Sequence, residues 1–231
     1  MVRLDSNLVE GRFLERLNRF AALVEVAGAP SLVHVANSGR MRELLAPGNR
    51  VLLTPIAGAA HRKTRFDLAL VDLGWTLASA DARLPNALVT EALREGRLPQ
   101  FRDYPQLRQE VVFGESRLDL RLDGPAGTCY IETKSVTLVN DGVGLFPDAP
   151  TIRGVKHLGS LGQAVAAGHR AAVVFVVQRA DAQAFAPNDA ADPAFGAALR
   201  QAVASGVEAL AYRCRVTEQE IVLAEALEIR L

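Results

Sequence analysis

A change of pattern near residue 80 constrains the fold more than any other feature of this chain. Before it, short apolar runs are separated by turn signals, such as Gly-Ala-Pro at 28–30 and Pro-Gly at 47–48. Beyond it, segments with apolar residues at helical spacing alternate with continuous apolar runs such as 171–177. The first pattern is typical of short strands and the second of an α/β layer sandwich. We therefore expect two domains, at residues 1–82 and 83–231.

The N-terminal part contains five strand-like runs and one helix-like insert at Met41–Leu45. The runs are GRFLERL, RFAALVEV, SLVHVA, NRVLLTPI and FDLALVDLGWTL. Five short strands with a helical insert favour a small closed β-barrel. An oligonucleotide-binding (OB) barrel is one such fold, but other small barrels share this strand count.

The C-terminal part predicts a mixed α/β domain. Helices are expected at about 86–95, 153–167 and 193–204, where apolar residues recur at helical spacing. LRQEVVFGES, RLDLRL and CYIETKSVTL are expected strands, and AAVVFVVQ and VEALAYRCRV are typical of buried parallel strands.

The apolar runs and the N-terminus indicate a cytoplasmic protein without a membrane partner. The longest purely apolar run, 171–177, is far shorter than the roughly 20 residues of a membrane helix. The N-terminus is charged from its third residue and lacks the apolar stretch of a secretory signal. Cys129 and Cys214 have no metal-type spacing, so we expect them to pack as free thiols.

Three charged residues on two neighbouring strands form the candidate chemical site. Asp119 lies between two leucines in RLDLRL, so its carboxylate faces away from their side chains. Glu132 and Lys134 are two apart on the next strand and share a face, while Thr133 points the other way. If the strands pair through the turn at 123–127, the three charged groups converge. Two carboxylates suit Mg²⁺, and a lysine beside them can orient a water or stabilise a phosphate.

This arrangement of Asp, a gap and Glu-x-Lys is the pattern of the PD-(D/E)xK nucleases, with Mg²⁺ or Mn²⁺ as the expected cofactor. Arg117-Leu118 stands where the type motif has a Pro before the first Asp. A cross-strand Lys–Glu ion pair on a sheet surface would give the same letters.

The neighbouring helices offer further candidates. Glu91 is a candidate third metal ligand, or else a solvated helix residue. Arg153, Lys156 and His157 lie near the start of the helix at 153–167, where phosphate is favoured. The alternative for His157 is a packing or capping role.

Six segments together resemble the sugar fermentation stimulation protein A family, SfsA. They are HVANSGRM (34–41), RKT (62–64), LPNALVTEAL (84–93), RLDLRL, YIETKSVTL (130–138) and FPDAPTIRGVKHL (146–158). The resemblance implies an OB-type barrel joined to a nuclease-like domain, DNA binding and a regulatory role in sugar utilisation. It places Asp119, Glu132 and Lys134 in the acidic site.

The resemblance also places Asn37, Ser38, Gly39 and Arg40 in a barrel loop. Where the family usually has Cys-Pro-Asn-Thr-Gly, this chain has Val-Ala-Asn-Ser-Gly. The Cys and Pro are therefore not essential to the loop in this chain.

DNA contacts are expected along the barrel. The formal net charge is zero, with 26 basic and 26 acidic residues, so binding relies on local clusters. The candidates, which would contact phosphates, are Arg12, Arg16, Arg19, Asn37, Arg40, Arg42, Arg62, Lys63 and Arg65. For any single arginine, an ordinary solvated surface is the alternative. An aromatic content of 6 % argues against a base-stacking platform, so duplex DNA is the expected partner.

Three functions fit these observations. The first is a DNA-binding regulator with a divalent-metal site, and the second is an active Mg²⁺- or Mn²⁺-dependent DNA endonuclease using Asp119, Glu132 and Lys134. The third is a carbohydrate-binding module, for which Trp75 and three tyrosines offer few stacking surfaces. Cleavage of both DNA strands would favour a homodimer.

Overall fold

The N-terminal half forms a closed five-stranded barrel, and a sixth short strand extends its sheet. The computed structural model describes residues 1–56 and 63–231. The strands are β2 (Val9–Asn18), β3 (Ala21–Val26), β4 (Ala29–His34), β5 (Arg50–Pro55), β6 (Phe66–Asp72) and β7 (Leu77–Ser79). Their order is β4-β3-β2-β5-β6-β7, and a parallel pairing of β4 with β6 closes the barrel. The predicted small barrel is confirmed.

The helical insert expected at Met41–Leu45 is wrong, because this segment forms a turn. The backbone N–H groups of Leu44 and Leu45 both donate to the carbonyl of Met41, at 3.1 and 2.9 Å. The chain then bends at Gly48, whose φ of 91° is in the left-handed region. Met41 and Leu44 are buried in the barrel core, so their apolar spacing reports packing rather than a helix.

A seven-stranded mixed sheet forms the centre of the C-terminal half. Its order is β1-β16-β15-β13-β10-β9-β8. The members are β1 (Val2–Arg3), β8 (Gln106–Phe113), β9 (Ser116–Gly124), β10 (Gly127–Val136), β13 (Arg170–Val177), β15 (Glu208–Val216) and β16 (Glu220–Ala226). The central strands β10, β13 and β15 run parallel. Seven residues of β13 are buried, so its apolar run forms the buried parallel strand that the sequence predicts.

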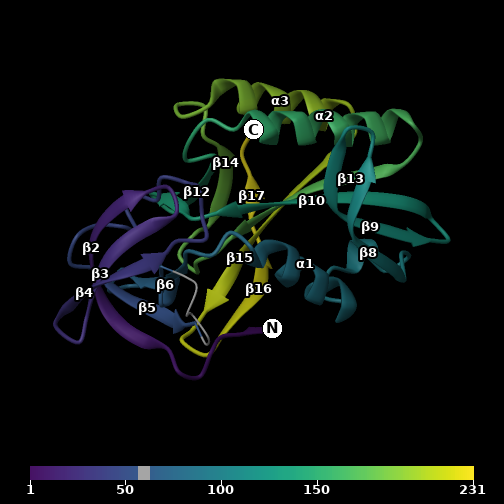
Figure 1. Ribbon diagram of the computed structural model, residues 1–231. Helices are drawn as coiled ribbons and strands as arrows, with labels where there is room; N and C mark the ends of the chain where they lie inside the picture. The colour runs from purple at the N-terminus through teal and green to yellow at the C-terminus, as the bar shows by residue number, and fades with distance from the viewer. Residues whose placement is uncertain (57–62) are drawn as a thin grey trace.

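Helices cover both faces of this sheet (Figure 1). They are α1 (Leu84–Arg94), α2 (Ile152–Ala166) and α3 (Pro193–Ala204), with a 3₁₀ turn at Pro99–Phe101. Leu88 of α1 packs into the core on one face, whereas Leu161 of α2 and Leu199 of α3 pack into the core on the other. A smaller sheet contains β11 (Leu138–Asn140), β12 (Val143–Phe146), β14 (Ala184–Pro187) and β17 (Glu228–Ile229). The predicted α/β architecture is confirmed.

The first strand of the chain belongs to the C-terminal sheet and not to the barrel. Val2 of β1 pairs antiparallel with Ile221 of β16. The chain therefore crosses from the C-terminal sheet to the barrel between β1 and β2. The expected N-terminal domain, 1–82, is therefore corrected, since its first strand belongs to the C-terminal sheet. The sequence did not predict this, because strands so far apart in the chain leave no local pattern that identifies them as partners.

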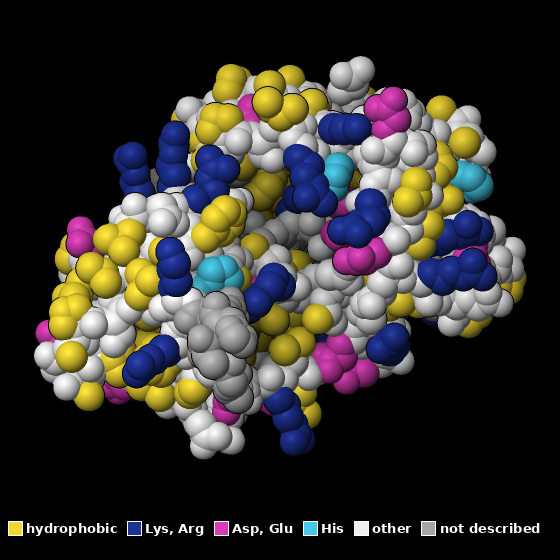
Figure 2. Space-filling view, viewed as in Figure 1, with side chains coloured by type: hydrophobic (Ala, Val, Ile, Leu, Met, Phe, Trp, Pro, Cys, Tyr) yellow, Lys and Arg dark blue, Asp and Glu magenta, His cyan; other side chains and the backbone are white. Residues whose placement is uncertain are grey.

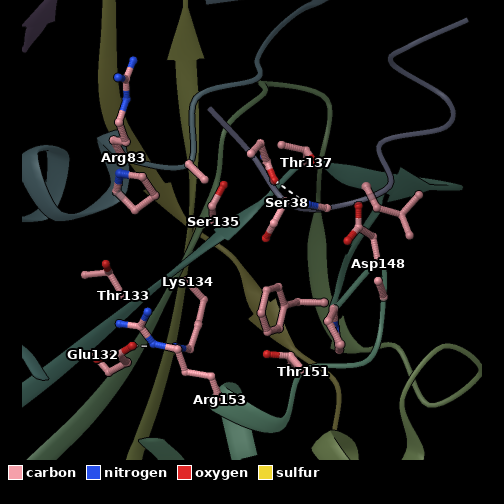
Figure 3. A pocket seen from close by; sticks show the side chains of 18 of the residues that line it. Ser38, Arg83, Glu132, Thr133, Lys134, Ser135, Thr137, Asp148, Thr151 and Arg153 are labelled. Carbon is pink, nitrogen blue, oxygen red and sulfur yellow. Dashed lines mark hydrogen bonds and ion pairs between the residues drawn. The ribbon is translucent and has the colours of Figure 1, made fainter. Parts of the chain in front are cut away.

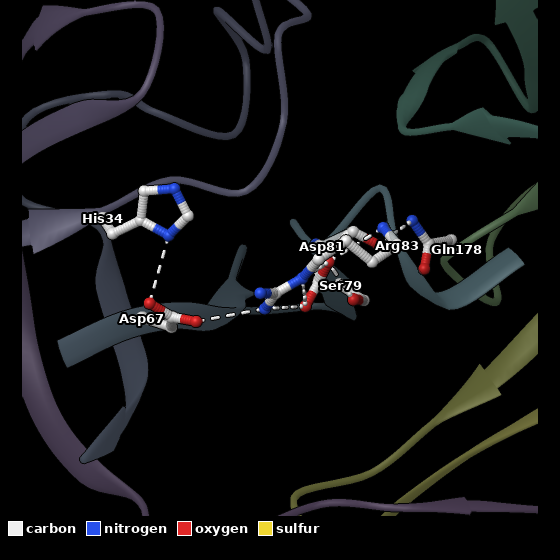
Figure 4. Close-up of polar contacts among 6 residues, drawn as sticks. All are labelled: His34, Asp67, Ser79, Asp81, Arg83 and Gln178. Carbon is white, nitrogen blue, oxygen red and sulfur yellow. Dashed lines mark hydrogen bonds and ion pairs between the residues drawn. The ribbon is translucent and has the colours of Figure 1, made fainter. Parts of the chain in front are cut away.

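A chain of polar contacts links the barrel to the centre of the sheet (Figure 4). Arg83 donates to Asp67 of the barrel at 3.1 Å and to Asp81 at 2.6 Å. Gln178, which follows β13, donates to the carbonyl of Asp81 at 3.0 Å and to the hydroxyl of Ser135 at 2.8 Å. Since Ser135 lies on β10, this link joins the barrel to the strand that carries the candidate site.

The two halves also share an apolar core. Leu52 and Leu70 of the barrel lie in the same buried cluster as Leu88 of α1. Cys129 and Cys214 are free and buried, and burial raises the pKa of each thiol to about 12, as expected of packing residues. Within the described residues, no helix has the length and apolar character needed to cross a membrane.

Candidate functional site

A cavity of about 660 Å³ lies between the barrel and the C-terminal domain. Its lining includes the barrel loop at 37–39, the middle of β10 and the segment 145–151. Figure 3 shows Glu132, Lys134 and Arg153 grouped on one side, with Ser38 and Asp148 on the other. Lys and Arg side chains surround the hollow on this face of the molecule (Figure 2). The structure brings Asp119, Glu132 and Lys134 together in this cavity.

Asp119 enters the site where two strands separate. The pairing of β9 with β10 runs as far as Leu120 opposite Ile131. One residue further on, Oδ2 of Asp119 accepts hydrogen bonds from the backbone N–H and the hydroxyl of Thr133, both at 2.7 Å. The carboxylate therefore accepts the backbone hydrogen bond that a partner strand would otherwise accept from Thr133. Thr133 also lines the cavity, although strand alternation predicted that its side chain points away.

Glu132 is held from two sides by hydrogen-bond donors. Nζ of Lys134 donates to Oε1 of Glu132 at 2.5 Å, and Nδ1 of His157 contacts the same oxygen. Nε of Arg153 donates to Nε2 of His157 at 3.3 Å, so the ring is held between Arg153 and Glu132. His157 is buried and thus acts on the carboxylate rather than on a phosphate at the surface.

The two carboxylates have opposite pKa shifts. Burial, with the nearby charge of Glu132, raises the pKa of Asp119 above its ordinary value. Burial alone would also raise the pKa of Glu132, but His157 and Lys134 outweigh it and lower that pKa. Oε2 of Glu132 is buried and accepts no hydrogen bond from the described residues. An ionised oxygen without a partner is costly in the interior, so this donor set suits a hard divalent cation.

Glu91, expected as a third ligand, does not reach the cavity. Its carboxylate forms an ion pair with the amino group of Met1. Asn86 lines the cavity from the same helix, and five residues rotate the side chain of Glu91 by about 140° away from it. No group of three or more His, Cys, Asp or Glu side chains in the described ranges is arranged to hold a metal ion. Of the carboxylates that line the cavity, Asp119 and Glu132 are therefore the candidate metal ligands.

Arg16 organises the barrel loop instead of facing solvent. All five of its N–H donors go to backbone carbonyls, at distances from 2.5 to 3.1 Å. The acceptors are the carbonyls of Asn18, Arg19, Asn37, Gly39 and Arg40. With no donor left over, Arg16 is unsuited to the DNA contact that the sequence predicted.

The same loop is held by the C-terminal domain. Oδ2 of Asp148 accepts from the backbone N–H of Met41 at 2.9 Å. A Cβ atom on Gly39 would stand 2.6 Å from that oxygen, so a larger residue here would displace the Asp148 carboxylate. Asn37 is buried, and its Oδ1 accepts from the N–H of Gly39 at 2.8 Å. Asn37 thus shapes the cavity wall and also lines it.

The other basic candidates fall into separate groups. Arg19 lines the main cavity and, with Arg40 and Arg42, a second one of about 550 Å³. Lys156 lies outside both cavities and pairs with Glu115 at 3.3 Å. Lys63 and Arg65 are exposed next to β6, beyond either cavity, and Arg62 lies outside the described residues.

Sequence reasoning missed Arg83, Asn86 and Asp148 in the cavity lining. Asn86 and Asp148 lie within segments that carry the family resemblance, in LPNALVTEAL and FPDAPTIRGVKHL, which could have marked them. Arg83 directly precedes the first of these segments.

Comparison with known proteins supports the resemblance along the whole chain. A family model described as "Sugar fermentation stimulation protein RE domain" matches residues 83–220, and one described as "SfsA N-terminal OB domain" matches residues 14–79. The second match confirms the OB type of the barrel.

Relatives match over almost their full length. The sugar fermentation stimulation protein homolog of Desulforamulus reducens is 46% identical over 224 residues, which is 97% of this chain and 93% of that protein. The homolog of Moorella thermoacetica is 44% identical over 232 residues, covering 100% of both. A solved structure, "The structure of Pyrococcus Furiosus SfsA in complex with Ca2+", matches with a TM-score of 0.89 and 29% identity over 98% of this chain and 97% of that one. This chain therefore belongs to the sugar fermentation stimulation protein family.

Proposed function

We propose that this protein binds DNA through its phosphates and holds a divalent cation, Mg²⁺ or Mn²⁺, between Asp119 and Glu132. The observation that carries the proposal is the unpartnered Oε2 of Glu132, a residue that is 3% exposed. Burial and repulsion from Glu132 also destabilise the charge of Asp119. A cation between the two carboxylates would relieve both effects. The Ca²⁺ complex of the Pyrococcus furiosus relative supports a divalent ion.

Two carboxylates are enough for such a site. Mg²⁺ usually keeps several water ligands in proteins and uses one or two carboxylates. The distant position of Glu91 is therefore compatible with the proposal. Lys134 and His157 keep Glu132 ionised, which a metal ligand requires.

Exposed arginines are the proposed phosphate contacts. Arg19, Arg40 and Arg42 line the second cavity, and Arg153 lines the cavity that contains the carboxylates. Because the net charge is zero, this local cluster would attract the DNA backbone without help from a global field. The relatives are named for sugar fermentation stimulation, and DNA binding at sugar-utilisation genes would account for that name.

The metal site is tested by calorimetric titration of Ca²⁺, Mg²⁺ and Mn²⁺ into the wild type and Asp119→Asn. The variant keeps an oxygen for the Thr133 hydrogen bonds but loses the charge, so affinity should fall by at least about tenfold. Asp123→Asn is the matched control, because Asp123 lies on the same strand and pairs with Arg121 outside the cavity. Equal affinities in all three proteins would reject the site.

DNA binding is tested by gel retardation at increasing salt, with the wild type and an Arg19→Ala/Arg40→Ala double variant. The variant should bind more weakly and with a smaller dependence on salt. If the wild type retards no DNA at low salt, the DNA-binding proposal is wrong.

A second candidate function is metal-dependent cleavage of DNA. The observation in its favour is Lys134, whose ammonium lies 2.5 Å from Glu132 at the carboxylate pair. A bound divalent ion would acidify a water and stabilise charge on a phosphate. Lys134 would stabilise charge on the reacting phosphate or orient the attacking water, while the buried setting would strengthen its effect.

Cleavage is tested by long incubation of DNA with the protein and Mn²⁺. Products that disappear in both Asp119→Ala and Lys134→Ala would establish an endonuclease. Intact DNA, together with retardation in the absence of metal, would favour the regulator.

A further inference from the structure

The reactive groups of the site lie below the surface of the molecule. The side chains of Glu132 and Lys134 are only 5% and 11% exposed. They are reached through a cavity of about 660 Å³ that both domains line. Pockets of about 300 to 1,000 Å³ are typical of sites that enclose a small molecule. A double helix, whose major groove alone is about 12 Å wide, is too broad to enter such a space.

The cavity has two chemically different sides. Lys134 and Arg153 provide positive charge beside the carboxylates. Leu145, Phe146 and Pro147 provide an apolar side. The ring of Phe146 is backed by the ring of Phe195, with centroids 5.0 Å apart, so it is fixed by packing. A phosphate needs only the first side, but an unstacked base needs the second.

A basic path continues from this cavity onto the barrel. Arg19, Ser38 and Gly39 line both the main cavity and the second one. The second cavity adds the exposed Arg40 and Arg42, which can contact the phosphates of flanking nucleotides. A strand that left the main cavity on this side would meet the cations Arg19, Arg40 and Arg42.

We propose that the main cavity takes an unpaired nucleotide unit of DNA, from a single strand or a strand end, and that intact duplex is held only outside it. The inference rests on the proposed function and names the substrate form that reaches the carboxylates. The sequence predicted duplex DNA because aromatic residues are few, whereas the cavity needs one fixed aromatic ring and not an extended platform.

The test compares the binding of three fluorescent DNAs by anisotropy in the presence of Ca²⁺. They are a single strand of about 12 nucleotides, within the site sizes of OB folds, a blunt duplex of that strand with its complement, and the same duplex with a single-stranded overhang. The single strand and the overhang should bind at least about tenfold more tightly than the blunt duplex. A preference for the overhang alone would identify strand ends as the source of the unpaired unit.

Ser38→Trp narrows the mouth of the cavity at an exposed position. It should remove the preference for unpaired DNA while leaving the calorimetric Ca²⁺ affinity unchanged. Ser6→Trp, at an exposed position outside both cavities, is the matched control and should behave as the wild type.

Equal affinity for the three DNAs, with no effect of Ser38→Trp, would overturn the inference and leave the proposed DNA binding intact. Failure of the wild type to bind any of the three DNAs would overturn the proposed function and this inference with it.

Discussion

The ring of His157 stands directly behind Glu132, with Nδ1 in contact with Oε1 of the carboxylate. Arg153 donates to the other ring nitrogen and so holds the ring from its far side. Lys134 donates to the same carboxylate oxygen, so Oε2 is the atom that remains without a partner. His157, which the sequence suggested as a phosphate contact, is thus a positioning residue for the candidate metal ligand.

His157→Phe should weaken Ca²⁺ binding by about 10- to 100-fold, because side chains that hydrogen-bond to a metal ligand orient that ligand and tune its charge. The phenylalanine keeps an aromatic ring but donates no hydrogen bond to Glu132. Calorimetric titration measures the effect, and His169→Phe is the control because His169 contacts the rings of Phe113 and Tyr130 instead. Wild-type affinity in His157→Phe would show that Glu132 needs no such support.

Asp119→Asn should stabilise the metal-free protein. Burial and Glu132 raise the pKa of Asp119, so its charged form destabilises the folded state at neutral pH. A gain of about 1 kcal/mol would raise the Tm by roughly 2–4 °C. Thermal unfolding measures the gain, and a given concentration of added Ca²⁺ should stabilise the wild type more than the variant.

Asp123→Asn should change the stability of the protein in the opposite direction. The Arg121 hydrogen bonds lower the pKa of Asp123, so loss of its charge should reduce stability slightly. If both variants shift the Tm in the same direction, the cause is not the carboxylate charge.

As the pH falls, the cation should be released at a higher pH than it would be from carboxylates of ordinary pKa. With its raised pKa, Asp119 takes up a proton at a pH above the ordinary aspartate value of about 3.9, and that proton competes with the metal. The lowered pKa of Glu132 keeps this second ligand ionised to lower pH. Titrations of Ca²⁺ at stepwise lower pH should therefore show proton uptake on release of the ion that grows as the pH falls and begins above the ordinary aspartate value. Affinity that stays constant down to the ordinary aspartate value would contradict the raised pKa.

Arg16→Ala should destabilise the protein by about 1–3 kcal/mol, because several carbonyls of the barrel loop lose their donors. Arg12→Ala, at an exposed position of the same strand, should change the free energy of unfolding much less. Denaturant unfolding of the two variants measures the difference. Similar losses would mean that the Arg16 hydrogen bonds contribute little.

Charge removal at Arg62, Lys63 and Arg65 should weaken DNA binding and flatten its dependence on salt. For duplex DNA, each phosphate that the protein no longer neutralises changes the slope by about 0.9. The same measurement on Arg19→Ala/Arg40→Ala shows which of the two sets of basic residues contacts the DNA. An unchanged slope in the triple alanine variant would exclude these three residues as phosphate contacts.

Local patterns were enough to predict most elements of the fold. The apolar run at 171–177 fixes β13 as a buried strand, and the helix expected at 193–204 matches α3. Such periodicity reports which face of an element is buried. The pairing of β1 with β16 escaped prediction, because no local pattern identifies a partner strand more than 200 residues away in the chain.

The core of the candidate site was also predictable, because it depends on short distances along the chain. Glu132 and Lys134 share a strand, and a tight turn brings Asp119 to them, so spacing alone places them together. Glu91 illustrates the limit: its helix was predicted, but which side of that helix faces the site depends on packing.

The sequence by itself determined the two-domain architecture and the acidic residues, since both depend on local periodicity and on a hairpin. Only the tertiary structure decided that Arg16 turns inward, that His157 is buried behind Glu132, and that Asp148 holds Met41 across 107 residues of chain. A polar residue has the same letter whether it faces solvent, a backbone carbonyl or a carboxylate. Packing between distant segments selects among these surroundings, and they decide what each charge can do.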